Sequence, residues 1–205
     1  VFSFLNLAWD DYLFLELTGR NDWSSTLPSE SSSYFYPSVS VSFIPTTAFD
    51  LRKSLPWLSF AKVRMGFANS ATDTDPYLLD FNYQSGMFGG QQTASFPGVI
   101  PPYRLLPQQV DTWEAGLNLG FLDSRIDIDF TYYYKDCYSQ ILRNLPVPVS
   151  SGASGITINE GELTNSGIEI VINTVPVQTR DFMIKSGINF SRNRNYVRSL
   201  GDYAE

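Results

Sequence analysis

The clearest pattern in the chain is a strict alternation of apolar with polar or small residues between positions 112 and 134. The alternating apolar positions are, in order, Trp113, Ala115, Leu117, Leu119, Ile126, Ile128, Phe130, Tyr132 and Tyr134. A period of two over two adjacent runs predicts a β-hairpin with one apolar and one polar face. A soluble sandwich would bury the apolar face in a core, whereas a membrane barrel would turn it toward lipid.

Weaker alternation predicts six further strands, at 1–9, 13–19, 34–44, 57–68, 163–174 and 181–191. A three-residue turn at 10–12 would bring Leu7 onto the same face as Leu15. Between the strands we expect one helical turn within 48–55 and a short strand near 78–83. We also expect a strand extension over 138–149, a Gly/Ser-rich loop from there to Glu162, and a polar tail from Arg192 onward.

The connections between these strands alternate in length along the chain. Short or medium connections fall at 10–12, 45–56, 121–125 and 176–180, and long ones at 20–33, 69–110 and 138–162. Short turns at one end and long loops at the other are typical of outer-membrane barrels. Ten tilted residues also rise about 23 Å, close to the ~25 Å apolar band. The predicted fold is therefore all-β, an antiparallel transmembrane β-barrel segment of about eight strands.

The composition narrows the possible functions. Aromatic residues make up 15% of the chain and charged residues only 17%, which is a low charge content for a soluble surface. The net charge of -7 leaves no basic stripe for nucleic acid. With one Cys, no His and no recognisable nucleophile, metal or phosphate motif, the sequence predicts neither an enzyme nor a cofactor or metal site.

Two sets of candidate functional residues follow from this arrangement. The charged residues predicted to face the barrel lumen are Glu16, Lys62, Arg64, Glu114, Asp127, Asp129, Glu169 and Lys185. They would form either a hydrated barrel wall that also anchors a plug, or part of a solute path. The aromatic residues of the longest loop are Tyr77, Phe81, Tyr83, Phe88, Phe96 and Tyr103. They would either contact a ligand, by stacking on sugar rings or holding a peptide, or pack the loop on itself.

Six ordered stretches resemble the SusC/RagA family of TonB-dependent outer-membrane transporters. They are DDYLFLELTGRNDWSSTL (10–27), YFYPSVSVSFI (34–44), SFAKVRMGFANS (59–70), TWEAGLNLGFLDSRIDIDFTYYYKDCYSQIL (112–142), NEGELTNSGIEIVINT (159–174) and NFSRNRNYVRSL (189–200). Together they cover more than half of the chain, in the order and approximate spacing of the family.

The resemblance implies a plugged barrel of about 22 strands that imports glycan or peptide fragments. It implies a SusD-like surface lipoprotein as a lid, energy from the TonB complex, and a place in the outer membrane of a Bacteroidetes-like Gram-negative cell. We expect residues 1–205 to be part of the barrel domain of a longer protein, without the plug that contacts TonB, because the strand pattern is already under way at Val1.

Two alternatives stay open from the sequence. One is a soluble β-sandwich that binds carbohydrate through its loop aromatic residues. The other is a complete eight-stranded outer-membrane barrel with a structural or adhesive role, in which the last strand would pair with the first. The two differ from the importer in what lies at the apolar face and at the sheet edges.

Overall fold

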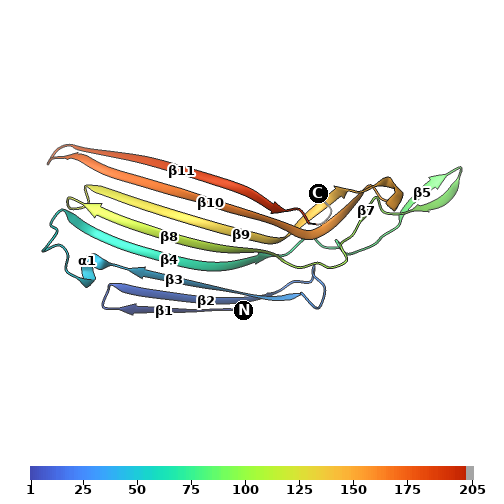
Figure 1. Ribbon diagram of the computed structural model, residues 1–205, viewed down its shortest axis with the longest axis horizontal. Coiled ribbons are helices and arrows are strands. Elements are labelled where there is room, and N and C mark those ends of the chain that lie inside the picture. The colour runs from blue at the N-terminus through green and yellow to red at the C-terminus, as the bar shows by residue number, and fades with distance from the viewer. Residues whose placement is uncertain (202–205) are drawn as a thin grey trace.

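The structure, a computed structural model, describes residues 1–201 and consists almost entirely of strands. Eight long strands lie side by side in one layer (Figure 1), in the spatial order in which they occur along the chain. Their bounds are Phe2–Trp9 (β1), Leu13–Trp23 (β2), Ser33–Phe43 (β3), Leu58–Thr72 (β4), Gln108–Phe121 (β8), Ile126–Pro146 (β9), Gly155–Gln178 (β10) and Met183–Ser199 (β11). Each is antiparallel to its neighbours, which confirms the predicted up-and-down sheet of eight strands.

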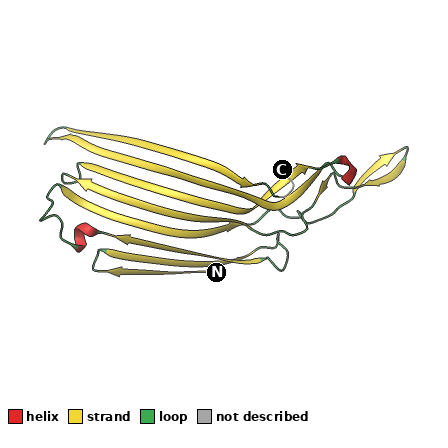
Figure 2. Cartoon of the chain, in the orientation of Figure 1, coloured by secondary structure: helices red, strands yellow, loops and turns green. Residues whose placement is uncertain are grey.

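The remaining elements lie at the ends of the long strands. Short turns and the four-residue helix Pro45–Ala48 (α1) are at one end, which we call the inner end, and the long loops are at the other, the outer end (Figure 2). The outer end carries a separate hairpin of Gln84–Phe88 (β5) and Gln91–Ser95 (β6), the two-residue strand Val99–Ile100 (β7) and the 3-10 turn Val149–Ser151. Neither helix is long and apolar enough to cross a membrane.

The register carries the alternation of each strand across the whole sheet. The turn at 10–12 sets Leu7 opposite Leu15, which confirms the predicted three-residue connection. Leu15 in turn stands opposite Val41, and Val41 opposite Met65. Because residues paired across an antiparallel ladder point to the same side, these rows merge into one continuous apolar face. The other side of the sheet, which carries the charged residues, is the polar face.

The apolar face is open rather than packed. Val41 is 40% exposed and Met65 64% exposed, although both lie on strands in the interior of the sheet. The few buried apolar side chains of the described residues lie toward the strand ends and in the loops: Leu27, Leu58, Ala61, Leu105, Ala153 and Ile158. An exposed apolar face of this size is stable only against another apolar medium, and acyl chains provide it.

The same observations exclude both alternatives that the sequence left open, the soluble sandwich and the complete eight-stranded barrel. Residues 1–201 contain no second large sheet stacked on the first, so the sandwich is wrong. Within the described chain, β1 pairs only with β2 and β11 only with β10, so the last strand does not close onto the first. The sheet is a segment of wall with two free edges.

Several predicted boundaries are wrong, all of them outside the central band of the sheet. The expected polar tail from Arg192 is strand as far as Ser199, and the expected loop before Glu162 is strand from Gly155 onward. The predicted extension over 138–149 is confirmed as far as Pro146, where β9 ends, whereas β2 reaches Trp23, beyond its expected end. Beyond the lipid, water can contact both faces, so these extensions do not need the period of two by which strands are recognised.

The connections also differ from prediction in detail. The helical turn is at Pro45–Ala48 rather than within 48–55, because Pro45 supplies a preset backbone angle for its first turn. The expected strand at 78–83 is irregular, and the hairpin of β5 and β6 follows it instead. Gly89 and Gly90 connect that hairpin with positive φ angles of 59° and 82°, which glycine adopts without strain.

Arginine substitutions on the two faces of β3 test which face meets lipid. Val39→Arg, on the apolar face in the middle of β3, should cost about 2–4 kcal/mol of folding free energy near the bilayer midplane. Ser40→Arg places the same side chain at nearly the same depth on the polar face, opposite Glu16, and should cost little. Unfolding of the complete protein in bilayers or detergent measures both, and equal costs would contradict the assignment of the faces.

Candidate functional site

The eight charged residues predicted to face the lumen all lie on the polar face. The register aligns the even-numbered positions of β2, β4 and β8 with the odd-numbered positions of β9 and β10. Lys185 lies on the corresponding odd-numbered side of β11. The eight residues therefore share one face of the sheet, and that this face lines a lumen stays a prediction.

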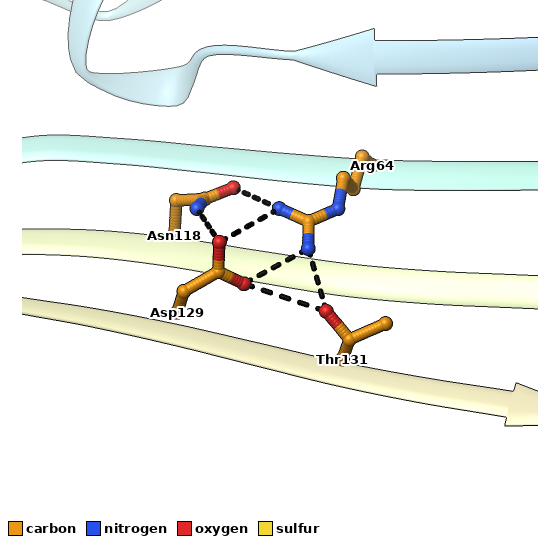
Figure 3. Close-up of polar contacts among 4 residues, drawn as sticks. All are labelled: Arg64, Asn118, Asp129 and Thr131. Carbon is orange, nitrogen blue, oxygen red and sulfur yellow. Dashed lines mark hydrogen bonds and ion pairs between the residues drawn. The ribbon is translucent and has the colours of Figure 1, made fainter. Parts of the chain in front are cut away.

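Four polar side chains form a network across three neighbouring strands (Figure 3). Arg64 of β4 is at the centre, and its Nη2 lies 2.8 Å from Asp129 Oδ1 and 2.6 Å from Thr131 Oγ1, both on β9. Its Nη1 donates to Asn118 Oδ1 at 2.5 Å, and Asn118 Nδ2 donates to Asp129 Oδ2 at 2.6 Å. Asp129 thus has hydrogen-bond donors on both carboxylate oxygens, and the network ties β4, β8 and β9 together.

A glycine makes this network possible. Arg64 stands opposite Gly116 on β8, and Gly116 stands opposite Thr131 on β9. To reach β9, the Arg64 side chain lies across Gly116, where an added Cβ would be 2.7 Å from Arg64 Cγ and closer still to Nε. Any larger residue at position 116 would therefore fill the space through which the guanidinium passes.

The other charged residues of the set are not part of an ion pair in residues 1–201. Glu16 and Glu114 occupy one row across the sheet, separated by Ser40 and Gly66. Both line an open groove of about 570 Å³ that Lys62 also borders. Because only small residues lie between them, these two carboxylates present hydrogen-bond acceptors to the contents of the barrel lumen.

Nearer the inner end, Asp127 and Lys185 line a second groove of about 360 Å³ together with Asn173. Glu169 stands alone opposite Thr131. Two of the eight predicted residues, Arg64 and Asp129, are therefore tied to each other, and the rest remain available on the polar face. No group of three or more His, Cys, Asp or Glu side chains in residues 1–201 is arranged to hold a metal ion.

The predicted loop aromatic residues divide into two groups. Phe81, Tyr83 and Phe96 pack edge to face against one another, with ring centroids 5.5–6.0 Å apart. They hold together the base of the hairpin formed by β5 and β6. Residues of the second group project into solvent: Tyr77 is 80% exposed, Phe88 is 83% exposed and Tyr103 is fully exposed.

The rest of the long loop is anchored to the sheet. Leu105 is completely buried, and its carbonyl accepts a hydrogen bond of 2.8 Å from Ser31 Oγ in the loop between β2 and β3. The next amide, of Leu106, donates to Asn159 Oδ1 of β10 at 2.5 Å. The hairpin of β5 and β6 thus projects from a fixed base.

One cluster at the outer end of the polar face was not predicted. Arg20 contacts Asp22 through two nitrogens, with Nε–Oδ1 at 2.9 Å and Nη2–Oδ2 at 2.8 Å. The guanidinium carbon of Arg20 lies 5.6 Å from the Tyr36 ring centroid, and the Tyr36 and Tyr34 rings are stacked at 5.8 Å. The sequence carries the signal, because Thr18, Arg20 and Asp22 continue the polar alternation of β2 into the predicted loop at 20–33.

Cys137 lies in the outer extension of β9, opposite Val110 and Leu163. Burial raises the pKa of its thiol above the ordinary value, and the nearby Asp136 carboxylate adds to the shift. A raised pKa keeps the group in the unreactive thiol form at neutral pH. The side chain therefore acts as a small apolar residue between strands.

Comparison with known proteins decides the family. The family model described as "TonB dependent receptor-like, beta-barrel" matches residues 1–204. The chain belongs to this family. TonB-dependent receptor P26 of Formosa agariphila is 28% identical over 98% of this chain, and TonB-dependent receptor SusC of Bacteroides thetaiotaomicron is 26% identical over 92%. These matches cover 20% and 19% of the relatives, so the chain spans about a fifth of their length.

Solved structures of RagAB have the same fold. The structure titled the RagAB peptide transporter matches with a TM-score of 0.87 and 20% identity, over 98% of this chain and 22% of that chain. The RagAB peptide importer in the open-open state gives 0.85 and 21%, with the same coverage. With the SusC relative, these matches confirm the predicted resemblance to SusC/RagA receptors and the transmembrane β-barrel segment.

The role of Gly116 in this TonB-dependent receptor can be tested by adding one methyl group. Gly116→Ala should displace Arg64 and cost about 1–3 kcal/mol through crowding and lost hydrogen bonds. Gly66→Ala is the matched control, since its nearest neighbour would be 3.6 Å away. Thermal unfolding of the complete receptor reports the difference. In an Arg64→Ala background the penalty at position 116 should vanish, and a penalty that persists would show that Arg64 is not its cause.

Proposed function

We propose that this chain forms part of the wall of an outer-membrane barrel that imports a glycan or peptide fragment in a TonB-dependent manner. The observation that carries the proposal is one open sheet with an exposed apolar face, a charged opposite face and long loops at only one end. Membership of the receptor family supports it. The names of the relatives describe receptors, and we assign this segment no catalytic role.

In this proposal the wall itself is passive. The network around Arg64 keeps three strands in fixed register, so that the polar face retains its shape while a plug moves. Glu16 and Glu114, which form no ion pair within residues 1–201, border the groove of the polar face, where they hydrate the lumen and contact the plug. In this proposal the plug and its contact with the TonB complex belong to other parts of the receptor.

The outer loops are the proposed contact region for the solute and for a SusD-like lipoprotein lid. Tyr77, Phe88 and Tyr103 are free to contact either, because their rings project into solvent. The packing of Phe81, Tyr83 and Phe96 supports a different role for these three, which is to hold the loop in position. The solute is a glycan or peptide fragment, and the peptide alternative has a parallel in the RagAB structures, which are titled as a peptide importer. Relatives from Formosa and Bacteroides support the outer membrane of a Bacteroidetes-like cell as its location.

Removal of the projecting hairpin tests this function. Deleting 84–95 in the complete receptor and joining Tyr83 to Phe96 through a short linker leaves the anchored Leu105 segment in place. Barrel assembly should be unchanged, while solute uptake or lid docking should fall about tenfold, the effect of losing ~1.4 kcal/mol of contact. Uptake of labelled oligosaccharide or oligopeptide by whole cells, and co-purification of the lid, measure the two outcomes.

Point variants give a matched control for the deletion. Phe88 is 83% exposed on the hairpin and Val149 is 87% exposed on another outer loop. Phe88→Ala should reproduce part of the defect, whereas Val149→Ala should leave uptake and docking as they are. Normal uptake and normal docking after the deletion would remove the hairpin from the mechanism.

A further inference from the structure

The membrane-facing side of β11 changes from apolar to positively charged residues part of the way along the strand. Phe190 is followed on the same face by Arg192 and Arg194, since alternate residues of a strand point to the same side. The register agrees, because Phe190 stands opposite Ile170 and Arg192 stands opposite Ile168. Two cations therefore continue the row of apolar side chains that meets the lipid.

Their depth places them at the outer boundary of the hydrocarbon. Counted from Met183, Arg192 is the tenth residue of β11 and Arg194 the twelfth. A strand needs about 9–11 residues to cross the apolar band, so both guanidinium groups reach the level of the lipid headgroups. On the neighbouring strands, Tyr134 of β9 and Trp113 of β8 are each the ninth residue counted from the inner end, and aromatic residues of this kind mark the interface.

Neither arginine is part of an ion pair in the part of the chain that the structure describes. No Asp or Glu of residues 1–201 forms an ion pair with either of them, whereas Arg198, further out on the same face, pairs with Asp136 at 3.3 Å. The residue paired with Arg194 across the ladder is Ser166, whose hydroxyl can donate a hydrogen bond. Two adjacent cations without an acidic partner in residues 1–201, in a chain with a net charge of -7, point to an anionic ligand.

We propose that Arg192 and Arg194 bind the phosphate group of a phosphorylated lipid in the outer leaflet. Their Cα atoms are about 6.6 Å apart along the strand, close enough for both guanidinium groups to reach one phosphate. Arginine binds phosphate through two parallel N–H donors, and Ser166 adds a third donor group beside them. The site rests on the membrane orientation used in the proposed function and not on transport.

Binding of lipid A to the complete receptor in neutral detergent tests the proposal. Native mass spectrometry or the thermal unfolding midpoint would be followed against the concentration of lipid A and of its dephosphorylated form. The wild type should bind the phosphorylated form at least about tenfold more tightly, and the R192Q/R194Q variant should lose that preference. Inorganic phosphate at the same concentration should have no effect.

A matched variant controls for net charge. K62Q/K185Q also removes two positive charges, but from the polar face, and should bind lipid A like the wild type. Equal binding of both lipid forms, an unchanged preference in R192Q/R194Q, or an equal loss in K62Q/K185Q would each overturn the site. A receptor that binds lipid A but does not import would refute the proposed function alone, so the two failures are distinguishable.

Discussion

Within the bilayer, every backbone amide must be hydrogen-bonded by the protein itself, because no water is present there. An unpaired amide in hydrocarbon costs several kcal/mol, so strands can cross only as members of a continuous ladder. The ladder in turn sets the register, and the register assigns each side chain to one of two faces. The apolar rows from Leu7 to Met65 and the charged positions opposite them follow from this single requirement.

The two faces of the sheet meet different surroundings, and these place different requirements on the side chains. Acyl chains accept any apolar side chain, so on that side the shape of individual residues matters little and exposure in the isolated segment is high. The polar face needs defined contacts, because a charged group there must be hydrated or paired. Arg64 satisfies its donors on two neighbouring strands, and it does so by crossing Gly116 of β8, which has no side chain.

This difference also explains what could be predicted from the sequence. The membrane band imposes a period of two on residues such as Leu15, Leu117 and Ile170. The strands, their two faces and the short turns between them could therefore be predicted from the sequence. The same pattern placed Arg64 and Asp129 on one face but could not pair them, since their contact depends on the register of β8 and on Gly116. The outer extensions, including 155–162 and the strand beyond Arg192, lacked that period because water contacts both of their sides.

The hairpin of β5 and β6 is held only at its base, by the packing of Phe81, Tyr83 and Phe96. Its two strands pair with each other and with no other strand of the described chain. Changes of length or sequence within it therefore leave the barrel ladder untouched. Such a module can diverge quickly between related receptors, so that ligand preference evolves without renewed selection for folding in the membrane.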